Sequence, residues 1–165
     1  MRGEIRVQTM FFTATAGELS RLAGAWSCGL DARAAGVQLA YADAADLDPA
    51  QLLELDTLVT GHDPVTVREA LLTPAREIGG GAALAPGALA QGTEEQVVLS
   101  VRTALYRQLG LSTDARLGEL AVRWEACSWG GDWSCARYLE LLRGLSMLSE
   151  LATRECRGVY VRFDV

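Results

Sequence analysis

His62 is the only histidine in the 165-residue chain, so chemistry that needs an imidazole depends on this residue. A hydrolytic triad would use it as the general base for a hydroxyl or thiol nucleophile. His62 and Asp63 directly follow Gly61, a residue type that commonly ends helices, and polar residues are frequent in such loops. The pattern predicts a polar loop histidine, with a catalytic base as the alternative.

The other groups that could do chemistry give weaker patterns. The glycine run at 79–81 does not match G-x-G-x-x-G, because position 84 is leucine, and no Gly-Lys-Ser/Thr sequence follows it. The cysteines lack C-x-x-C spacing, and a zinc site would need ligands that one histidine does not supply; they are Cys28, Cys127, Cys135 and Cys156. We expect buried free thiols, with a disulfide or a metal site as alternatives, and we predict no catalytic residue and no cofactor.

Acidic residues are concentrated in one part of the chain. The net charge is −6, and residues 34–67 contain six acids but no lysine or arginine. An acidic chain lacks the basic surface that binding to phosphate backbones requires, which argues against a direct nucleic-acid partner. Asp48 precedes Pro49, an arrangement typical of a helix start, so its carboxylate has a structural role. The remaining five are the predicted partner-binding patch: Asp43, Asp46, Glu54, Asp56 and Asp63.

Hydrophobic periodicity and capping residues predict the elements that position these groups. Expected strands cover 5–12, 37–42 and 159–163; expected helices cover 16–30, 49–60, 64–72, 94–109, part of 111–123, and 134–155. Thr15 and Thr93 are each followed three residues later by Glu or Gln, which predicts a capping box at two of these helices. Residues 79–92 are expected to form the longest irregular segment.

These elements predict an α+β fold in a single compact domain spanning residues 1–165, with several helices packed on a small sheet. The strands near the two termini are expected to be neighbours. Charged residues within the first six positions, and no long apolar run, argue against an export signal or a membrane span and predict a cytoplasmic protein.

Three tryptophans lie in a segment that reads as a compact aromatic turn, residues 124–135. Trp124, Trp129 and Trp133 could form a recognition surface, because tryptophan anchors many interfaces. The favoured interpretation is a small core beneath the final helix, because large aromatic side chains are mostly buried.

The order of short motifs along the chain resembles the YfbM-like family of small bacterial α+β proteins. In the first half of the chain, the matching motifs are Phe11-Phe12 before a capped Glu-Leu helix, and Leu47-Asp48 opening a helix that ends at Leu58-Val59-Thr60-Gly61. The next two are Glu77-Ile78-Gly79 and Thr93-Glu94-Glu95-Gln96-Val97. The last two are Trp133 ahead of a Tyr-Leu-Glu-Leu-Leu helix and a final Gly158-Val-Tyr-Val. The chain departs from the family pattern in the loop at 79–92 and in the turn at 124–135. Some family members are immunity proteins that neutralise a toxin delivered by a neighbouring cell, and the resemblance brings no catalytic residues with it.

The leading functional hypothesis is therefore a non-catalytic immunity protein that occludes the active site of a cognate toxin with a basic surface, such as a nuclease. The acidic residues could equally be a solvated surface that keeps the protein soluble. Two alternatives stay open: a small-molecule-binding or enzymatic domain that uses His62 and the glycine-rich loop, and a self-associating structural subunit.

Overall fold

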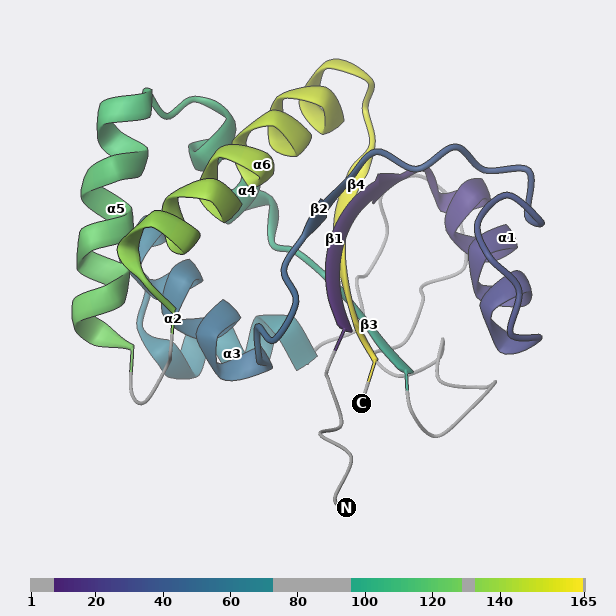
Figure 1. The fold of residues 1–165 in the computed structure, drawn as a ribbon, viewed down its shortest axis with the longest axis horizontal. Helices are drawn as coiled ribbons and strands as arrows, with labels where there is room; N and C mark the ends of the chain where they lie inside the picture. The colour runs from purple at the N-terminus through teal and green to yellow at the C-terminus, as the bar shows by residue number, and fades with distance from the viewer. Residues whose placement is uncertain (1–7, 73–95, 129–132, 165) are drawn as a thin grey trace.

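The computed structural model describes residues 8–72, 96–128 and 133–164 (Figure 1). Its elements are β1 (Gln8–Ala14), α1 (Ala16–Ser27), β2 (Tyr41–Asp43), α2 (Pro49–Thr60), α3 (Pro64–Leu72), β3 (Gln96–Ser100), α4 (Thr103–Gly110), α5 (Asp114–Cys127), α6 (Cys135–Arg154) and β4 (Gly158–Asp164). The predicted glycine-rich loop, the cap at Thr93 and Trp129 lie outside the described residues.

The sheet has the strand order β2-β1-β4-β3, and all its pairs are antiparallel. The strands nearest the two ends of the chain are central neighbours, with Phe11 opposite Val161 in the register. The α+β class and the pairing of the terminal strands are therefore confirmed.

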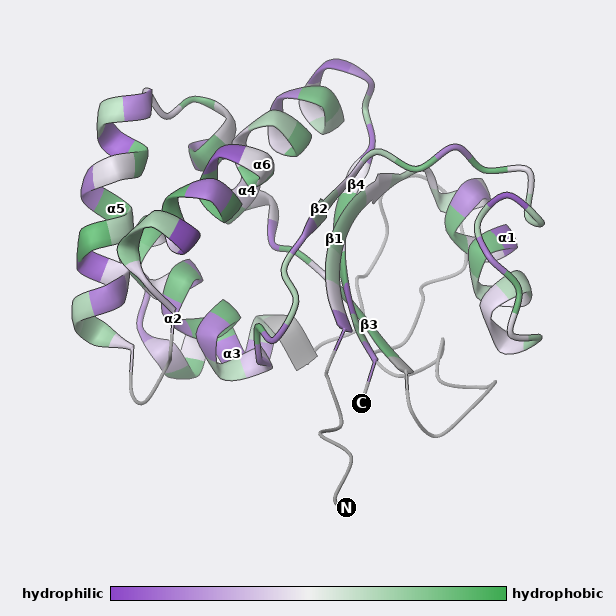
Figure 2. Cartoon of the chain, in the orientation of Figure 1, coloured by the Kyte–Doolittle hydropathy of each residue, from purple (hydrophilic) through white to green (hydrophobic). Residues whose placement is uncertain are grey.

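The main core lies between the sheet and α6. Phe11 of β1 and the alternating residues Val159, Val161 and Phe163 of β4 are buried on this side. Helices α4 and α5 pack on α6, and α2 packs on α4 and α5, so most of the helices lie on one side of the sheet (Figure 1). In Figure 2 the strands are largely apolar, whereas the helices alternate between polar and apolar residues, as expected for elements with one buried face.

The opposite side of the sheet is covered by α1. Phe12 of β1 packs there with Leu19, Leu22 and Trp26, because successive residues of a strand face opposite sides. The predicted capping box is confirmed: Thr15 Oγ1 accepts from the Glu18 N–H at 3.2 Å, and the Glu18 carboxylate accepts from the Thr15 N–H at 3.0 Å.

The predicted extension of this helix to Leu30 is wrong. Helix α1 ends at Ser27, and Leu30 is 53% exposed instead of facing the core. Gly29 has a φ of 70°, a left-handed conformation that ends helices and that glycine adopts without steric cost.

The helix predicted over 94–109 is also wrong in its first half. Residues Gln96–Ser100 form β3 and pair with β4, and the helical part begins only at Thr103. Val97, Val98 and Leu99 suit a strand, and hydrogen bonds to β4 outweigh the local helix signal.

The segment predicted as an aromatic turn is partly helical. Trp124 lies within α5 and is fully buried, and Trp133 is 6% exposed. Both rings pack on Tyr138 of α6, with centroid distances of 4.4 Å and 5.4 Å. The core interpretation of these two tryptophans is confirmed, although they belong to the main core and not to a separate small one.

Candidate functional site

Two of the predicted acidic residues are exposed together at the connection between β2 and α2. Asp43 ends β2, and its carboxylate accepts from the Ala45 N–H at 3.0 Å. Asp46 has a left-handed φ of 68°, and its carboxylate lies 3.6 Å from the Arg137 guanidinium. Side-chain exposures of 57% for Asp46 and 41% for Arg137 leave this pair well solvated, so Arg137 screens the carboxylate only in part.

Tyr41 adds an exposed aromatic ring to these carboxylates. It is 64% exposed, and it lies two residues before Asp43 on the edge strand β2. Residues two apart on a strand face the same side, whereas Ala42 between them is buried against α6. We call Tyr41, Asp43 and Asp46 the β2 surface.

Asp48, the acid assigned to a cap, has that role. Its carboxylate accepts from the Gln51 N–H at 2.9 Å, and the Gln51 side chain accepts from the Asp48 N–H at 3.0 Å. The Gln51 amide then donates to the Tyr138 hydroxyl at 3.1 Å, which joins the start of α2 to α6.

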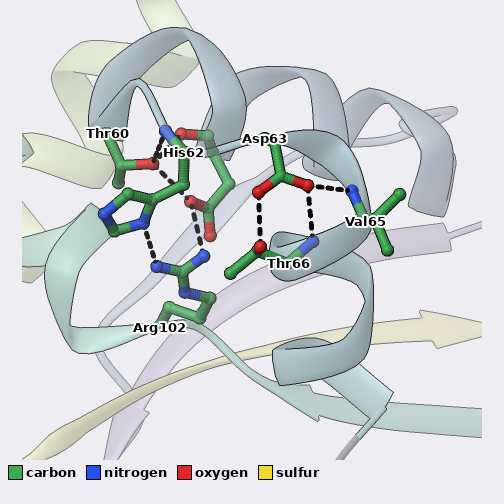
Figure 3. Close-up of polar contacts among 7 residues, drawn as sticks. Thr60, His62, Asp63, Val65, Thr66 and Arg102 are labelled. Carbon is green, nitrogen blue, oxygen red and sulfur yellow. Dashed lines mark hydrogen bonds and ion pairs between the residues drawn. The ribbon is translucent and has the colours of Figure 1, made fainter.

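Asp63 is exposed but lies at the other end of α2. Its carboxylate accepts from the N–H groups of Val65 and Thr66 at 3.1 Å and 3.0 Å and from the Thr66 hydroxyl, and these bonds lower the pKa of Asp63 (Figure 3). Twelve residues of helix, about 18 Å in length, separate it from Asp48. The five predicted residues therefore do not form one continuous patch.

Asp56 is not on the surface at all, which corrects its prediction as an exposed partner-binding residue. It is 0% exposed, and its Oδ1 lies 3.5 Å from Nη1 of Arg102 and accepts from the Thr60 hydroxyl at 3.1 Å. Burial raises the pKa of Asp56, and the attraction of Arg102 offsets that rise only in part.

Glu54 is half-buried, so it contributes less to the surface than predicted. Its Oε2 is shielded from solvent and has no hydrogen-bond partner among the described residues.

A sequence signal for the burial of Asp56 was present. Leu52, Leu55, Asp56 and Val59 follow the i, i+3, i+4, i+7 spacing of a helix face that packs on a core. The sequence offers no comparable signal for Arg102, which is distant in the chain and meets Asp56 only because α4 packs on α2.

His62 contacts the same arginine. Its Nδ1 lies 2.5 Å from Nη2 of Arg102, and its backbone N–H donates to the Thr60 hydroxyl at 3.3 Å (Figure 3). We call Asp56, Thr60, His62 and Arg102 the Arg102 cluster.

This contact determines what the imidazole can do. A guanidinium only donates hydrogen bonds, so Nδ1 of His62 is the acceptor and the proton of the neutral ring is on Nε2. Both ring nitrogens are then occupied, one by a hydrogen bond and the other by a proton. In this arrangement His62 has no free basic nitrogen for a nucleophile, which a triad requires.

The remaining candidate groups do not converge on a site. The four cysteines are free, and the expectation that they are buried is wrong, because Cys28, Cys127 and Cys156 are exposed and Cys135 is half-buried. Within the described ranges, no three His, Cys, Asp or Glu residues are grouped as metal ligands would be. No helix in this part of the chain is long and apolar enough to cross a membrane.

A hollow between α2, α4 and α5 shares no lining residue with the β2 surface or the Arg102 cluster. It is lined by Val59, Gln108, Leu111, Ser112, Arg116 and Leu120. Its charged residue, Arg116, is paired with Glu119 at 3.0 Å on the same helix.

No protein-family model matches the chain, and no curated protein or solved structure matches it either. The resemblance to the YfbM-like family therefore stays a prediction from the order of its motifs.

Proposed function

We propose that this protein is a non-catalytic, cytoplasmic immunity protein that binds and neutralises a cognate secreted antibacterial toxin, a nuclease being one candidate. The observation that carries the proposal is the β2 surface, where an exposed tyrosine lies on the same edge strand as one of two exposed carboxylates. Tyrosine is enriched among the residues that dominate binding energy, and carboxylates speed encounter with a basic partner.

The chemistry of the partner follows from charge. A toxin that cleaves nucleic acid needs a basic cleft for phosphate groups, and carboxylates on a rigid surface resemble those phosphates. Asp43 and Asp46 are held by the Ala45 N–H and by Arg137, so these two groups are ordered before binding. The proposed interface uses these two acids and Tyr41, without the buried Asp56.

The alternative enzymatic function receives less support from the structure. His62 was its central residue, and the contact with Arg102 occupies the nitrogen that a general base would use. Self-association would use the tryptophans as its contact surface, but Trp124 and Trp133, the two that the structure describes in this segment, are buried.

The direct experiment co-expresses the toxin encoded by the neighbouring gene with and without this protein. We expect the protein to restore growth and to form a complex with the toxin. Growth that stays inhibited in the presence of well-folded protein would refute the proposal.

The β2 surface is then tested by association kinetics with the double variant Asp43→Asn/Asp46→Asn. Asparagine removes both charges and tolerates the left-handed backbone at position 46. We expect association at low ionic strength to slow by about tenfold, and salt to reduce the difference, because such steering is electrostatic. Glu119→Gln, an exposed acid on α5, is the matched control and should leave the rate unchanged. Equal rates for all three proteins would place the interface elsewhere.

A further inference from the structure

Arg102 contacts two titratable side chains, the carboxylate of Asp56 and the imidazole of His62. It is the N-cap residue of α4, its side chain is 14% exposed, and its backbone carbonyl accepts from the N–H groups of Leu105 and Tyr106. One nitrogen of its guanidinium lies near Asp56 of α2, and another contacts His62, which lies between α2 and α3. The side chain therefore connects the start of α4 to α2 and to residues 61–63, which we call the α2–α3 corner (Figure 3).

The two contacts of Arg102 require different protonation states of its partners. A guanidinium stays charged at all physiological pH values and presents only donors. A carboxylate accepts from it without a change of state, but an imidazole nitrogen accepts only while it carries no proton. Protonation of His62 would place an N–H and a positive charge against the Arg102 nitrogen that now lies 2.5 Å from Nδ1.

We propose that the Arg102–His62 contact is a pH-sensitive connection between α4 and the α2–α3 corner. It forms while the imidazole is neutral and breaks when His62 takes up a proton. This inference rests on the geometry of the Arg102 cluster and is independent of the proposed binding function.

The imidazole is the partner that moves. Arg102 is mostly buried and keeps the attraction of Asp56, whereas His62 is exposed and follows Gly61, which has a left-handed φ of 70°. Release of His62 removes the link from α4 to the segment that leads into α3. Helix α3 then depends on its packing against α2 and on the buried Val67.

Other charged groups near the corner come from each neighbouring element. Asp56 lies on α2 beside Arg102; Asp63 precedes α3, and its carboxylate accepts hydrogen bonds from Val65 and Thr66. Arg68 and Glu69 lie further along α3. On α5, which packs on α2, Arg116 is paired with Glu119.

The first test measures the protonation of the imidazole directly in the full chain. Because His62 is the only histidine, its ring signals in long-range ¹H–¹⁵N spectra are unambiguous. At about pH 7.5, where an imidazole can be neutral, we expect Nδ1 to be unprotonated and Nε2 to carry the hydrogen. A ring with its hydrogen on Nδ1, or a rapid exchange between the two forms, would overturn the proposal.

The second test compares thermal unfolding of the wild type and of His62→Gln at about pH 7.5 and 5.5, on either side of the usual histidine titration. The glutamine oxygen can accept from Arg102 at both pH values, and Asp56 is present in both proteins, so its own titration cancels. We expect acidification to lower the Tm of the wild type by about 2–4 °C relative to the variant, the shift typical of one lost hydrogen bond in a chain of this size. An identical response of the two proteins would refute the pH-sensitive connection.

If His62→Gln does not fold, backbone amide hydrogen exchange of the wild type at the two pH values tests the proposal instead. The N–H group of Val67 donates to the Asp63 carbonyl at 3.1 Å at the start of α3. Its protection, corrected for intrinsic exchange rates, should fall on acidification between these pH values, and unchanged protection would refute the proposal.

Discussion

The guanidinium of Arg137 stacks on the indole of Trp133, with its Cζ atom 3.9 Å from the ring centroid. Nη2 of the same group donates to the Ala45 carbonyl and lies near the Asp46 carboxylate. Because Trp133 packs in turn on Tyr138, one side chain joins the β2–α2 connection to the aromatic part of the core. The β2 surface is thus attached to a rigid part of the fold.

Replacement of Arg137 should therefore destabilise the protein. We expect Arg137→Met to lower the free energy of unfolding by about 1–2 kcal/mol, because it removes a cation–π contact and a hydrogen bond to a backbone carbonyl. Urea denaturation measures the change. Arg143→Met is the matched control on the same helix, since Arg143 pairs with Asp114 in an exposed position, and it should change little. Equal losses in both variants would contradict this account of Arg137.

Two helical glycines should respond in opposite directions to alanine. A Cβ atom at Gly110 of α4 would lie 3.2 Å from the Glu150 backbone nitrogen and 3.3 Å from the Ser149 Cβ of α6, whereas nothing lies within 4 Å at Gly118 of α5. We expect Gly110→Ala to cost about 1–2 kcal/mol through displacement of α6, and Gly118→Ala to stabilise by up to about 1 kcal/mol through helix propensity. Thermal unfolding compares them, and a stabilised Gly110→Ala would show that α4 and α6 have room to separate.

The buried carboxylate of Asp56 leads to a prediction for the pH dependence of stability. Burial raises the pKa of Asp56 above its ordinary value of 3.8, so the folded protein takes up this proton at a higher pH than the unfolded chain. Its contribution to stability therefore increases as pH falls through the folded pKa toward 3.8. Asp56→Asn removes this response while it keeps the shape of the side chain.

Urea denaturation between about pH 7 and pH 4 measures this difference, a range that ends near the usual aspartate pKa. We expect the wild type to gain stability relative to Asp56→Asn as the pH falls. Asp63 and Asp114, whose pKa values are lowered, are common to both proteins and do not affect the comparison. A relative loss on acidification would mean that Arg102 outweighs burial at this carboxylate.

Local sequence patterns predicted the elements correctly where the structure of a segment depends mainly on its own residues. Thr15 forms the predicted capping box, Asp48 caps α2 as predicted, and the amphipathic pattern from residue 134 onward becomes α6. The alternation in Val159–Phe163 becomes β4. In these elements, propensity, capping and hydrophobic period agree with the tertiary packing.

The sequence-based predictions failed where contacts with residues distant in the chain determine the structure. The segment that became β3 carried a helix signal, but β4 supplied hydrogen bonds that the local sequence does not contain. Asp56 was taken for a surface acid although its helical spacing matches the buried face of α2. The sequence does not show its contact with the distant Arg102, and the contact of Arg102 with His62 was missed for the same reason. The sequence therefore identified the acidic residues and His62 as candidates. Only the fold shows that some of them lie on the β2 surface and others in the Arg102 cluster.

The central pairing of β1 with β4 has a consequence for folding kinetics. Nearly the whole described chain lies between these strands, whereas β2 is closer in sequence to β1, and β3 is closer to β4. Contacts between distant segments require a costly loop closure, and proteins rich in such contacts fold slowly. The high helix content would suggest rapid folding, but we expect the pairing of β1 with β4 to be the slow step, because it joins the two ends of the described chain, whereas the contacts among α4, α5 and α6 are closer in sequence.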